Sequence, residues 1–260
     1  LESEQRGLIL EWQLGLLIDS HSYASVDESF RAAFGLLIST LLRLYSPEDY
    51  PIRRLRVILY ALRFLLEHPN SLDSSITETL IAEGTKAVSG EIDVSHDSEL
   101  ARFATHIKGS LRLALGFQRG ELQADELNEV ISSWLSLTRD CHDWESLESH
   151  VDDTEHWILQ MKAVVDYMEV RGMWKLQLSI SELLLRILEL QETKDLSAIV
   201  LTLSRLALQY CRLGYCKKAG ILLSRAGRYI EEHNVSCLAI VSCKLVCVEY
   251  LLETGNLEKA

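Results

Sequence analysis

Cys141, His142 and Asp143 are adjacent in the sequence, and these three residue types together could serve nucleophilic catalysis. A cysteine nucleophile needs a histidine base that faces it in space. Successive residues on a helix point about 100° apart, so a Cys-His pair that is sequential does not meet this requirement. We therefore expect this segment to be a helix end or a loop without a catalytic role.

Histidines and carboxylates concentrate between residues 142 and 156, where they could bind a metal ion. A helical metal site places two histidines four residues apart on one face. His150 and His156 are six residues apart and lie on nearly opposite faces of a helix. The sequence therefore predicts a solvated acidic helix with no metal and no other cofactor. An acidic contact for a basic partner stays open as an alternative.

Other signatures of chemistry receive little support. The sequence contains no Gly-x-Gly-x2-Gly, Walker or Gly-x-Ser-x-Gly motif, so nothing favours nucleotide or esterase chemistry. Trp144, Trp157 and Trp174 could form an aromatic platform, but large aromatic residues at helical spacing are more often core residues. The six cysteines form no Cys-x2-Cys pair, and we expect them to be buried and reduced.

Four arginines form the one basic concentration in a chain whose net charge is −12: Arg53, Arg54, Arg56 and Arg63. On a helix, Arg56 and Arg63 lie within about 20° of each other. The simpler interpretation is that these arginines line a solvated helix face. The more specific interpretation is that they form a docking stripe for an acidic segment or a phosphate of a partner. General nucleic-acid binding is not expected, because that function needs an excess of positive charge.

The candidate side chains described above are expected to lie on helices. Apolar residues recur at helical spacing almost everywhere, and no proline follows Pro69. No apolar run approaches the length of a membrane span, so none is expected. The pattern predicts helices over 4–18, 26–45, 51–67, 73–88, 98–118, 123–139, 144–170, 173–191, 194–213, 215–233, 235–254 and from 256.

Residues 203–226 have the spacing of a tetratricopeptide unit, a helix pair that buries its apolar face only against neighbouring units. Gly172, Gly214 and Gly255 stand at regularly spaced tight joints, where left-handed helix ends are expected. The predicted fold class is all-α, with antiparallel helix pairs stacked as a tetratricopeptide-like superhelix, an α-solenoid. The repeat-defining residues are Leu206, Ala207, Tyr210, Gly214, Ala219, Leu223, Ala226, Gly255 and Ala260.

Two regions are expected along the chain. Residues 1–120 form a helical region that is either an atypical part of the stack or a separate bundle. Residues 121–260 form the repeats, whose period of about 41 residues is longer than that of the usual tetratricopeptide unit. Because the chain starts without methionine and reaches Ala260 in the middle of a repeat, we expect it to be a piece of a longer protein.

Two short runs resemble the helical-repeat region of fungal separase, and the order of the helical segments is similar too. The runs are Tyr50-Pro51-Ile52-Arg53-Arg54-Leu55-Arg56-Val57 and Tyr210-Cys211-Arg212-Leu213-Gly214-Tyr215-Cys216-Lys217-Lys218-Ala219-Gly220. Separases are cysteine endopeptidases that cut the kleisin subunit of cohesin to release sister chromatids. Their His–Cys dyad lies in a C-terminal domain that nothing in this sequence matches, so the resemblance implies a non-catalytic scaffold.

The resemblance also implies partners and a location. The expected partners are a securin-like inhibitor and the protease domain of the same polypeptide, in the cytoplasm and the nucleus. The alternative hypothesis is a tetratricopeptide adaptor subunit of another large assembly, such as a cohesin loader or a ubiquitin ligase. An all-helical enzyme is the third hypothesis.

Overall fold

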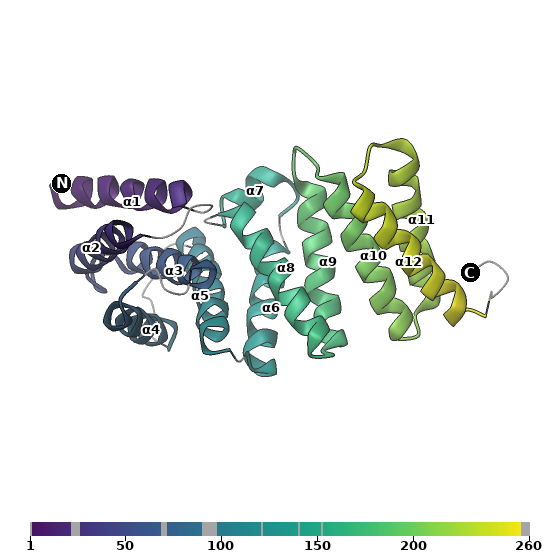
Figure 1. The fold of residues 1–260 in the computed structure, drawn as a ribbon, viewed down its shortest axis with the longest axis horizontal. Coiled ribbons are helices and arrows are strands. Elements are labelled where there is room, and N and C mark those ends of the chain that lie inside the picture. The colour runs from purple at the N-terminus through teal and green to yellow at the C-terminus, as the bar shows by residue number, and fades with distance from the viewer. Residues whose placement is uncertain are drawn as a thin grey trace. The chain divides into compact units, whose positions relative to one another are not determined.

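The computed structural model describes residues 2–21, 27–68, 72–89, 98–120, 122–139, 141–151 and 153–255. Over these ranges the chain forms twelve α-helices and no strand, which confirms the predicted all-α class (Figure 1). The fold divides into two compact units, Leu1–Leu137 with His150–Asp152, and Thr138–Ser149 with Asp153–Ala260. Within each unit, helices that follow one another in the chain pack together, as in an α-solenoid. None of the described helices combines the length and the apolar character of a membrane span.

The first unit is built around one central helix. Its helices are α1 (Glu2–His21), α2 (Glu28–Leu44), α3 (Pro51–Glu67), α4 (Ser74–Ser89), α5 (Ser98–Arg119) and, except for its last residue, α6 (Ala124–Thr138). The central helix is α3, which packs against α2, α4 and α5. The rings of Phe30, Phe34 and Phe64 join α2 to α3, with centroids between 4.9 and 5.4 Å apart.

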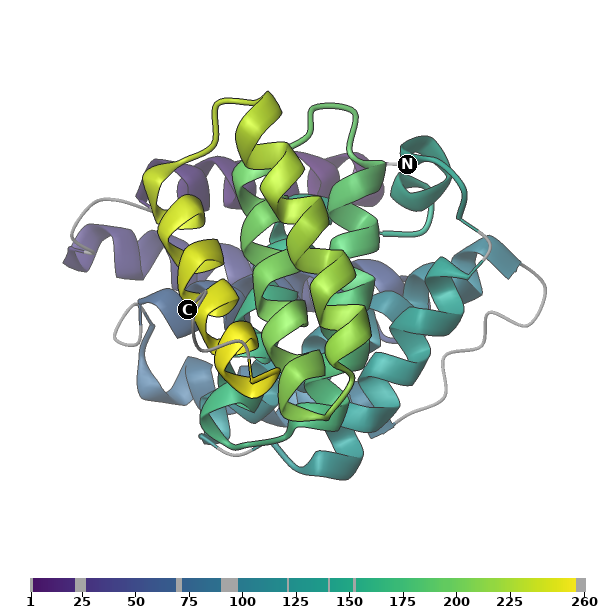
Figure 2. The same cartoon turned by 90° about the vertical axis from the view of Figure 1, so that its right-hand side faces the viewer.

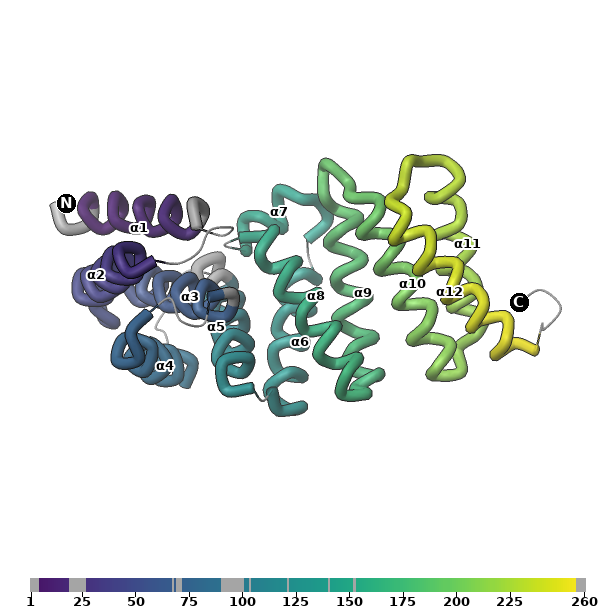
Figure 3. The backbone as a smooth tube through the Cα atoms, in the orientation of Figure 1, coloured from purple at the N-terminus to yellow at the C-terminus, as the bar shows by residue number. Residues whose placement is uncertain are grey.

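The second unit contains the repeats. Its helices are α7 (Trp144–Glu148), α8 (Thr154–Val170), α9 (Trp174–Leu190), α10 (Leu196–Arg212), α11 (Cys216–Glu232) and α12 (Cys237–Glu253). Figure 3 shows that α8 to α11 lie side by side in chain order. In this row α10 is enclosed by α9, α11 and α12, and Figure 2 shows α12 beside α10 and α11.

The prediction of one helix over 144–170 is wrong, because two helices occupy this range. An aspartate caps the start of each. The Oδ1 atom of Asp143 accepts a hydrogen bond from the N–H of Ser146 at 2.8 Å, and Oδ1 of Asp153 accepts one from the N–H of His156 at 2.9 Å. Such caps satisfy N–H groups that have no partner inside the helix. The apolar period continues across the break, so it could not reveal the second start.

The joints between helices have the predicted backbone conformation. Gly172, Gly214 and Gly255 have φ angles of 68°, 82° and 76°, which confirms the left-handed helix ends. After α10, the N–H of Tyr215 donates to the carbonyl oxygen of Tyr210 at 2.8 Å, a bond typical of the Schellman turn. The turn reverses the chain over a short joint, so α10 and α11 can pack as an antiparallel pair. Ala260 and the helix expected from residue 256 lie outside the described residues.

The helix starts repeat with the same period as these glycines. Asp153, Asp195 and Ser236 are the N-cap residues of α8, α10 and α12, and each stands the same distance along the chain before the glycine that ends its helix. In each case the side chain accepts a hydrogen bond from a backbone N–H in the first turn of the helix. Aspartate and serine are preferred N-cap residues, so this signal was available in the sequence and was missed.

Two glycine-to-alanine substitutions in the second unit should have opposite effects. At Gly214 an added Cβ meets no neighbouring atom, so the cost of Gly214→Ala comes from the left-handed backbone and should be about 1–2 kcal/mol. At Gly227, inside α11, an added Cβ also meets no neighbour, and Gly227→Ala should stabilise the unit by about 0.5–1 kcal/mol. Urea denaturation of both variants checks this expectation, and a stabilising Gly214→Ala would contradict it.

Candidate functional site

The four arginines singled out in the sequence lie on α3, and most of them are engaged within the first unit. Arg53 pairs with Glu11 at 3.3 Å and keeps 29% of its side chain exposed. The guanidinium group of Arg56 lies 5.9 Å from the ring centroid of Tyr60. Arg63 is 6% exposed, so it lies in the interior and not on a solvated face.

Arg54 joins three elements of the first unit. Its guanidinium group donates to the carbonyl oxygens of Leu42 and Tyr45, and it pairs with Glu83 of α4 at 2.8 Å. Guanidinium groups that bind carbonyls at a helix C-terminus stabilise that end. Arg54 therefore holds the end of α2 against α3 and α4. A docking role for the more exposed arginines stays a prediction.

His106 is a buried ionisable group of α5 that sequence reasoning did not single out. It is 0% exposed. Burial, together with the positive charge of Arg63, lowers the pKa of His106 to about 3. The imidazole of the folded first unit is therefore neutral at neutral and mildly acidic pH.

The stability of the first unit should depend on His106 below neutral pH. In the unfolded chain this histidine regains a pKa of about 6.5, so the unfolded state binds a proton that the folded state does not. Between pH 7 and pH 5 the free energy of unfolding should fall by about 2 kcal/mol through this group. Urea denaturation at several pH values checks this, with His106→Leu as the comparison. An equal fall in that variant would contradict the assignment.

Two carboxylates of the cluster between residues 142 and 156, Asp143 and Asp153, cap helix starts. Asp143 and Ser146 form a capping box at the start of α7, and the hydrogen bonds that Asp143 accepts from Ser146 lower its pKa. Cys141 is buried beside this cap. Among the described residues, no group of three or more histidine, cysteine or acidic side chains could hold a metal ion.

The tryptophans and cysteines follow the expectation of burial only in part. Trp157 is 0% exposed, as expected of a core residue. Trp144 is half-buried and donates its indole N–H to Glu148 at 2.7 Å, and Trp174 lies under the guanidinium group of Arg212 at 4.5 Å. The six cysteines are all free thiols, but Cys237 is exposed and Cys216 and Cys247 are only half-buried, which corrects the expectation that every one is buried.

A pocket of about 290 Å³ lies between α8, α9 and α10 of the second unit. Its buried lining is mostly apolar and includes Val165, Leu184 and Ala198. Its more exposed lining is mostly charged and includes Lys162, Asp166, Asp195 and Arg205. Arg205 and Asp166 form an ion pair at 2.7 Å that links α10 to α8. An apolar base with charges of both signs around it suits the binding of a side chain from an extended peptide.

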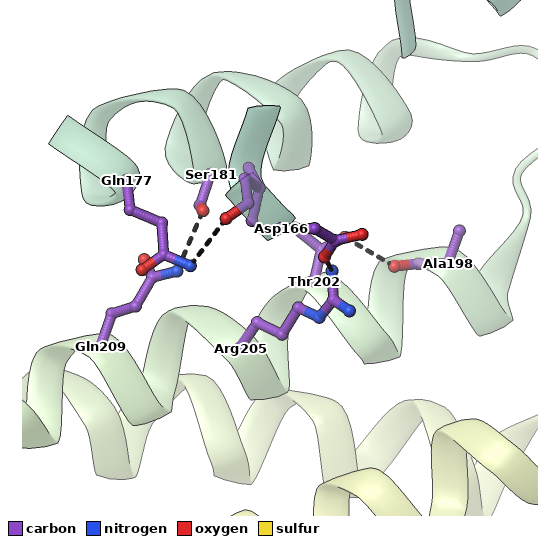
Figure 4. A network of polar contacts seen from close by, with 8 residues as sticks. Asp166, Gln177, Ser181, Ala198, Thr202, Arg205 and Gln209 are labelled. Atoms are coloured by element: carbon purple, nitrogen blue, oxygen red, sulfur yellow. Dashed lines mark hydrogen bonds and ion pairs between the residues drawn. The ribbon is translucent and has the colours of Figure 1, made fainter. Parts of the chain in front are cut away.

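Buried polar contacts fix the three helices behind this pocket, as Figure 4 shows. Nε2 of Gln177 donates to the carbonyl oxygen of Val165 at 3.2 Å, which ties α9 to α8. Nε2 of Gln209 donates to Oγ of Ser181 at 3.2 Å, which ties α10 to α9. Gln177, Ser181 and Gln209 are at most 2% exposed, so these bonds form away from water and specify how the helices align.

Six of the repeat-defining residues are buried in α10 and α11: Leu206, Ala207, Tyr210, Ala219, Leu223 and Ala226. Ala207, Ala219 and Ala226 are 0% exposed. Small side chains at these positions allow close packing of the helices. Tyr210 donates its hydroxyl to Glu182 of α9, and burial together with Glu182 raises its pKa to about 12.

The sequence did not reveal the pocket. Lys162, Asp166 and Arg205 belong to two different helices, and no motif joins them. The signal that could have led to them is the repeat period, because it predicts that α8 and α10 occupy equivalent places in successive repeats.

Comparison with known proteins shows what this chain is similar to. Over all of its 260 residues the chain is 48% identical to the separin of Emericella nidulans, and it spans 12% of that protein's length. No family model matches the chain. No solved structure matches it. The similarity covers both short runs on which the resemblance was based, so the resemblance to fungal separase is confirmed: the whole chain is similar to one segment of a fungal separin.

Proposed function

We propose that this chain is a non-catalytic helical scaffold within a separase, the cysteine endopeptidase that cleaves cohesin kleisin when sister chromatids separate. The observation that carries the proposal is 48% identity over the whole chain to 12% of a separin. In this proposal the His–Cys dyad lies in another part of the polypeptide, and the parent protein acts in the cytoplasm and the nucleus.

The scaffold would bind protein partners, namely a securin-like inhibitor and the protease domain of its own polypeptide. Two features of the second unit support this role. Stacked helix pairs offer an extended surface, and the pocket between α8, α9 and α10 provides an apolar base with Lys162 and Arg205 beside it. The arginines of α3 that keep some exposure, Arg53 among them, are candidates for a further contact with an acidic part of the inhibitor.

Charge reversal at the pocket tests the proposed binding of the inhibitor. In the full-length separase, the double variant Lys162→Glu/Arg205→Glu should weaken the affinity for the securin-like inhibitor by about tenfold, the effect of losing about 1.4 kcal/mol. Folding should persist, because the Arg205–Asp166 pair is exposed on both sides and contributes little to stability.

The matched control is Lys217→Glu/Arg228→Glu, which makes the same change of net charge at two exposed positions of α11. It should leave the affinity within about twofold of the original. Equal affinities for the two double variants, measured by fluorescence titration, would overturn the pocket as the binding site.

A further inference from the structure

The last described helix, α12, has apolar side chains on two faces. One face is buried in the second unit through Ala239, Cys243 and Val246. The other face carries five exposed apolar residues, here named the α12 stripe: Leu238, Val241, Leu245, Val248 and Leu252, which are 70%, 54%, 62%, 38% and 50% exposed. Their helical spacing aligns them along one side of the helix. A helix that is apolar on both sides is typical of a buried position.

The corresponding positions of α10 are covered. The repeat period that relates Gly214 to Gly255 also relates the two helices. Four members of the stripe, Val241, Leu245, Val248 and Leu252, have a buried counterpart one period earlier in α10. These counterparts are Val200, Ser204, Ala207 and Cys211, which are 0%, 0%, 0% and 5% exposed. In α10 this face is enclosed because α11 and α12 both pack against the helix. Ser197, one period before Leu238, is half-buried. Four of the five positions of the α12 stripe therefore correspond to a face that is covered in the complete repeat.

We propose that the α12 stripe is the docking face of a helix that the same polypeptide supplies after Gly255, as the second helix of a third repeat. Gly255 ends α12 with a φ of 76°, the conformation in which Gly172 leads to α9 and Gly214 leads to α11. Residue 260 is alanine, one period after Ala219, whose side chain is fully buried in α11. The relative is much longer than this chain, which spans 12% of it, so its polypeptide has the length for further repeats.

The apolar surface of the α12 stripe indicates what kind of helix could cover it. A covering helix needs its own apolar face and small residues where it approaches α12 closely, as α11 has Ala219 and Ala226 toward its neighbours. Contiguous apolar patches of this kind on soluble proteins are commonly contact surfaces. The proposal does not depend on whether the chain binds the inhibitor.

Photo-crosslinking in the full-length protein tests this proposal. A photoreactive amino acid replaces Leu245 of the α12 stripe, and mass spectrometry identifies the peptide that it captures. We expect capture of a peptide of the same molecule within about 20 residues after Gly255, the length of one helix and its joint. The yield should not depend on protein concentration. The same probe at Leu159, a 57% exposed residue of α8, should not capture that peptide.

Three other outcomes would overturn the proposal. They are capture of a second copy of the chain, capture of a different protein, and equal capture of the peptide from Leu159 and Leu245. A second measurement guards against misfolding of the probe variant. In the full-length protein, Leu245→Lys should speed proteolytic cleavage in α12 by about tenfold or more, because a buried leucine contact is lost, whereas Leu159→Lys should change cleavage by less than about twofold. Equal cleavage rates would also overturn the proposal.

Discussion

Replacement of Ala207 by aspartate should unfold the second unit or lower its free energy of unfolding by about 4 kcal/mol or more. Ala207 is 0% exposed on α10, the helix that α9, α11 and α12 enclose. A carboxylate at this position would lose its hydration and overfill a site that holds one methyl group. Urea denaturation followed by circular dichroism measures the loss.

The control for this variant is Ser224→Asp, which introduces the same side chain at an exposed position of α11. It should change stability by no more than about 0.5 kcal/mol. If Ala207→Asp were as stable as this control, the result would contradict the described packing of helices around α10.

Replacement of Phe34 by alanine should destabilise the first unit by about 3–5 kcal/mol. The ring is 0% exposed and contacts two other aromatic rings, at centroid distances of 5.4 Å to Phe30 and 4.9 Å to Phe64. Truncation removes both contacts and leaves a cavity between α2 and α3.

Hydrogen exchange can assign this loss to the correct unit. Peptides of α3 should lose protection in Phe34→Ala, whereas peptides of α10 should keep theirs, because the two helices belong to different compact units. Leu36→Ala, at a 69% exposed position of the same helix, is the control and should leave both sets of peptides protected. Equal loss of protection in α3 and α10 would contradict this assignment.

Local signals explain why most helices could be predicted from the sequence. The predicted range 51–67 coincides with α3, because Pro51 favours a helix start and His68-Pro69 follows the end. The repeat glycines adopt their predicted conformation because a left-handed residue is a local requirement. The error at 144–170 is local too, since the cap at Asp153 begins a new helix without interrupting the apolar period.

The candidate sites were harder to predict because they depend on contacts between helices. The angle between Arg56 and Arg63 on one helix suggested a shared solvated face. Since α2, α4 and α5 all pack against α3, Arg63 is buried instead. The pocket beside Arg205 depends on how α8, α9 and α10 align, and the buried glutamines that set this alignment come from separate helices.

Crosslinking mass spectrometry of the full-length parent protein mixed with the proposed securin-like inhibitor tests the proposed scaffold most directly. The account predicts lysine crosslinks between the inhibitor and this segment, with Lys162 beside the pocket among the linked residues. These crosslinks should weaken in Arg205→Glu, which keeps the reactive lysine, and persist in Lys217→Glu/Arg228→Glu. The account would be contradicted if the inhibitor formed crosslinks only to other parts of the polypeptide. In that result, crosslinks between lysines within this segment would show that its lysines are reactive.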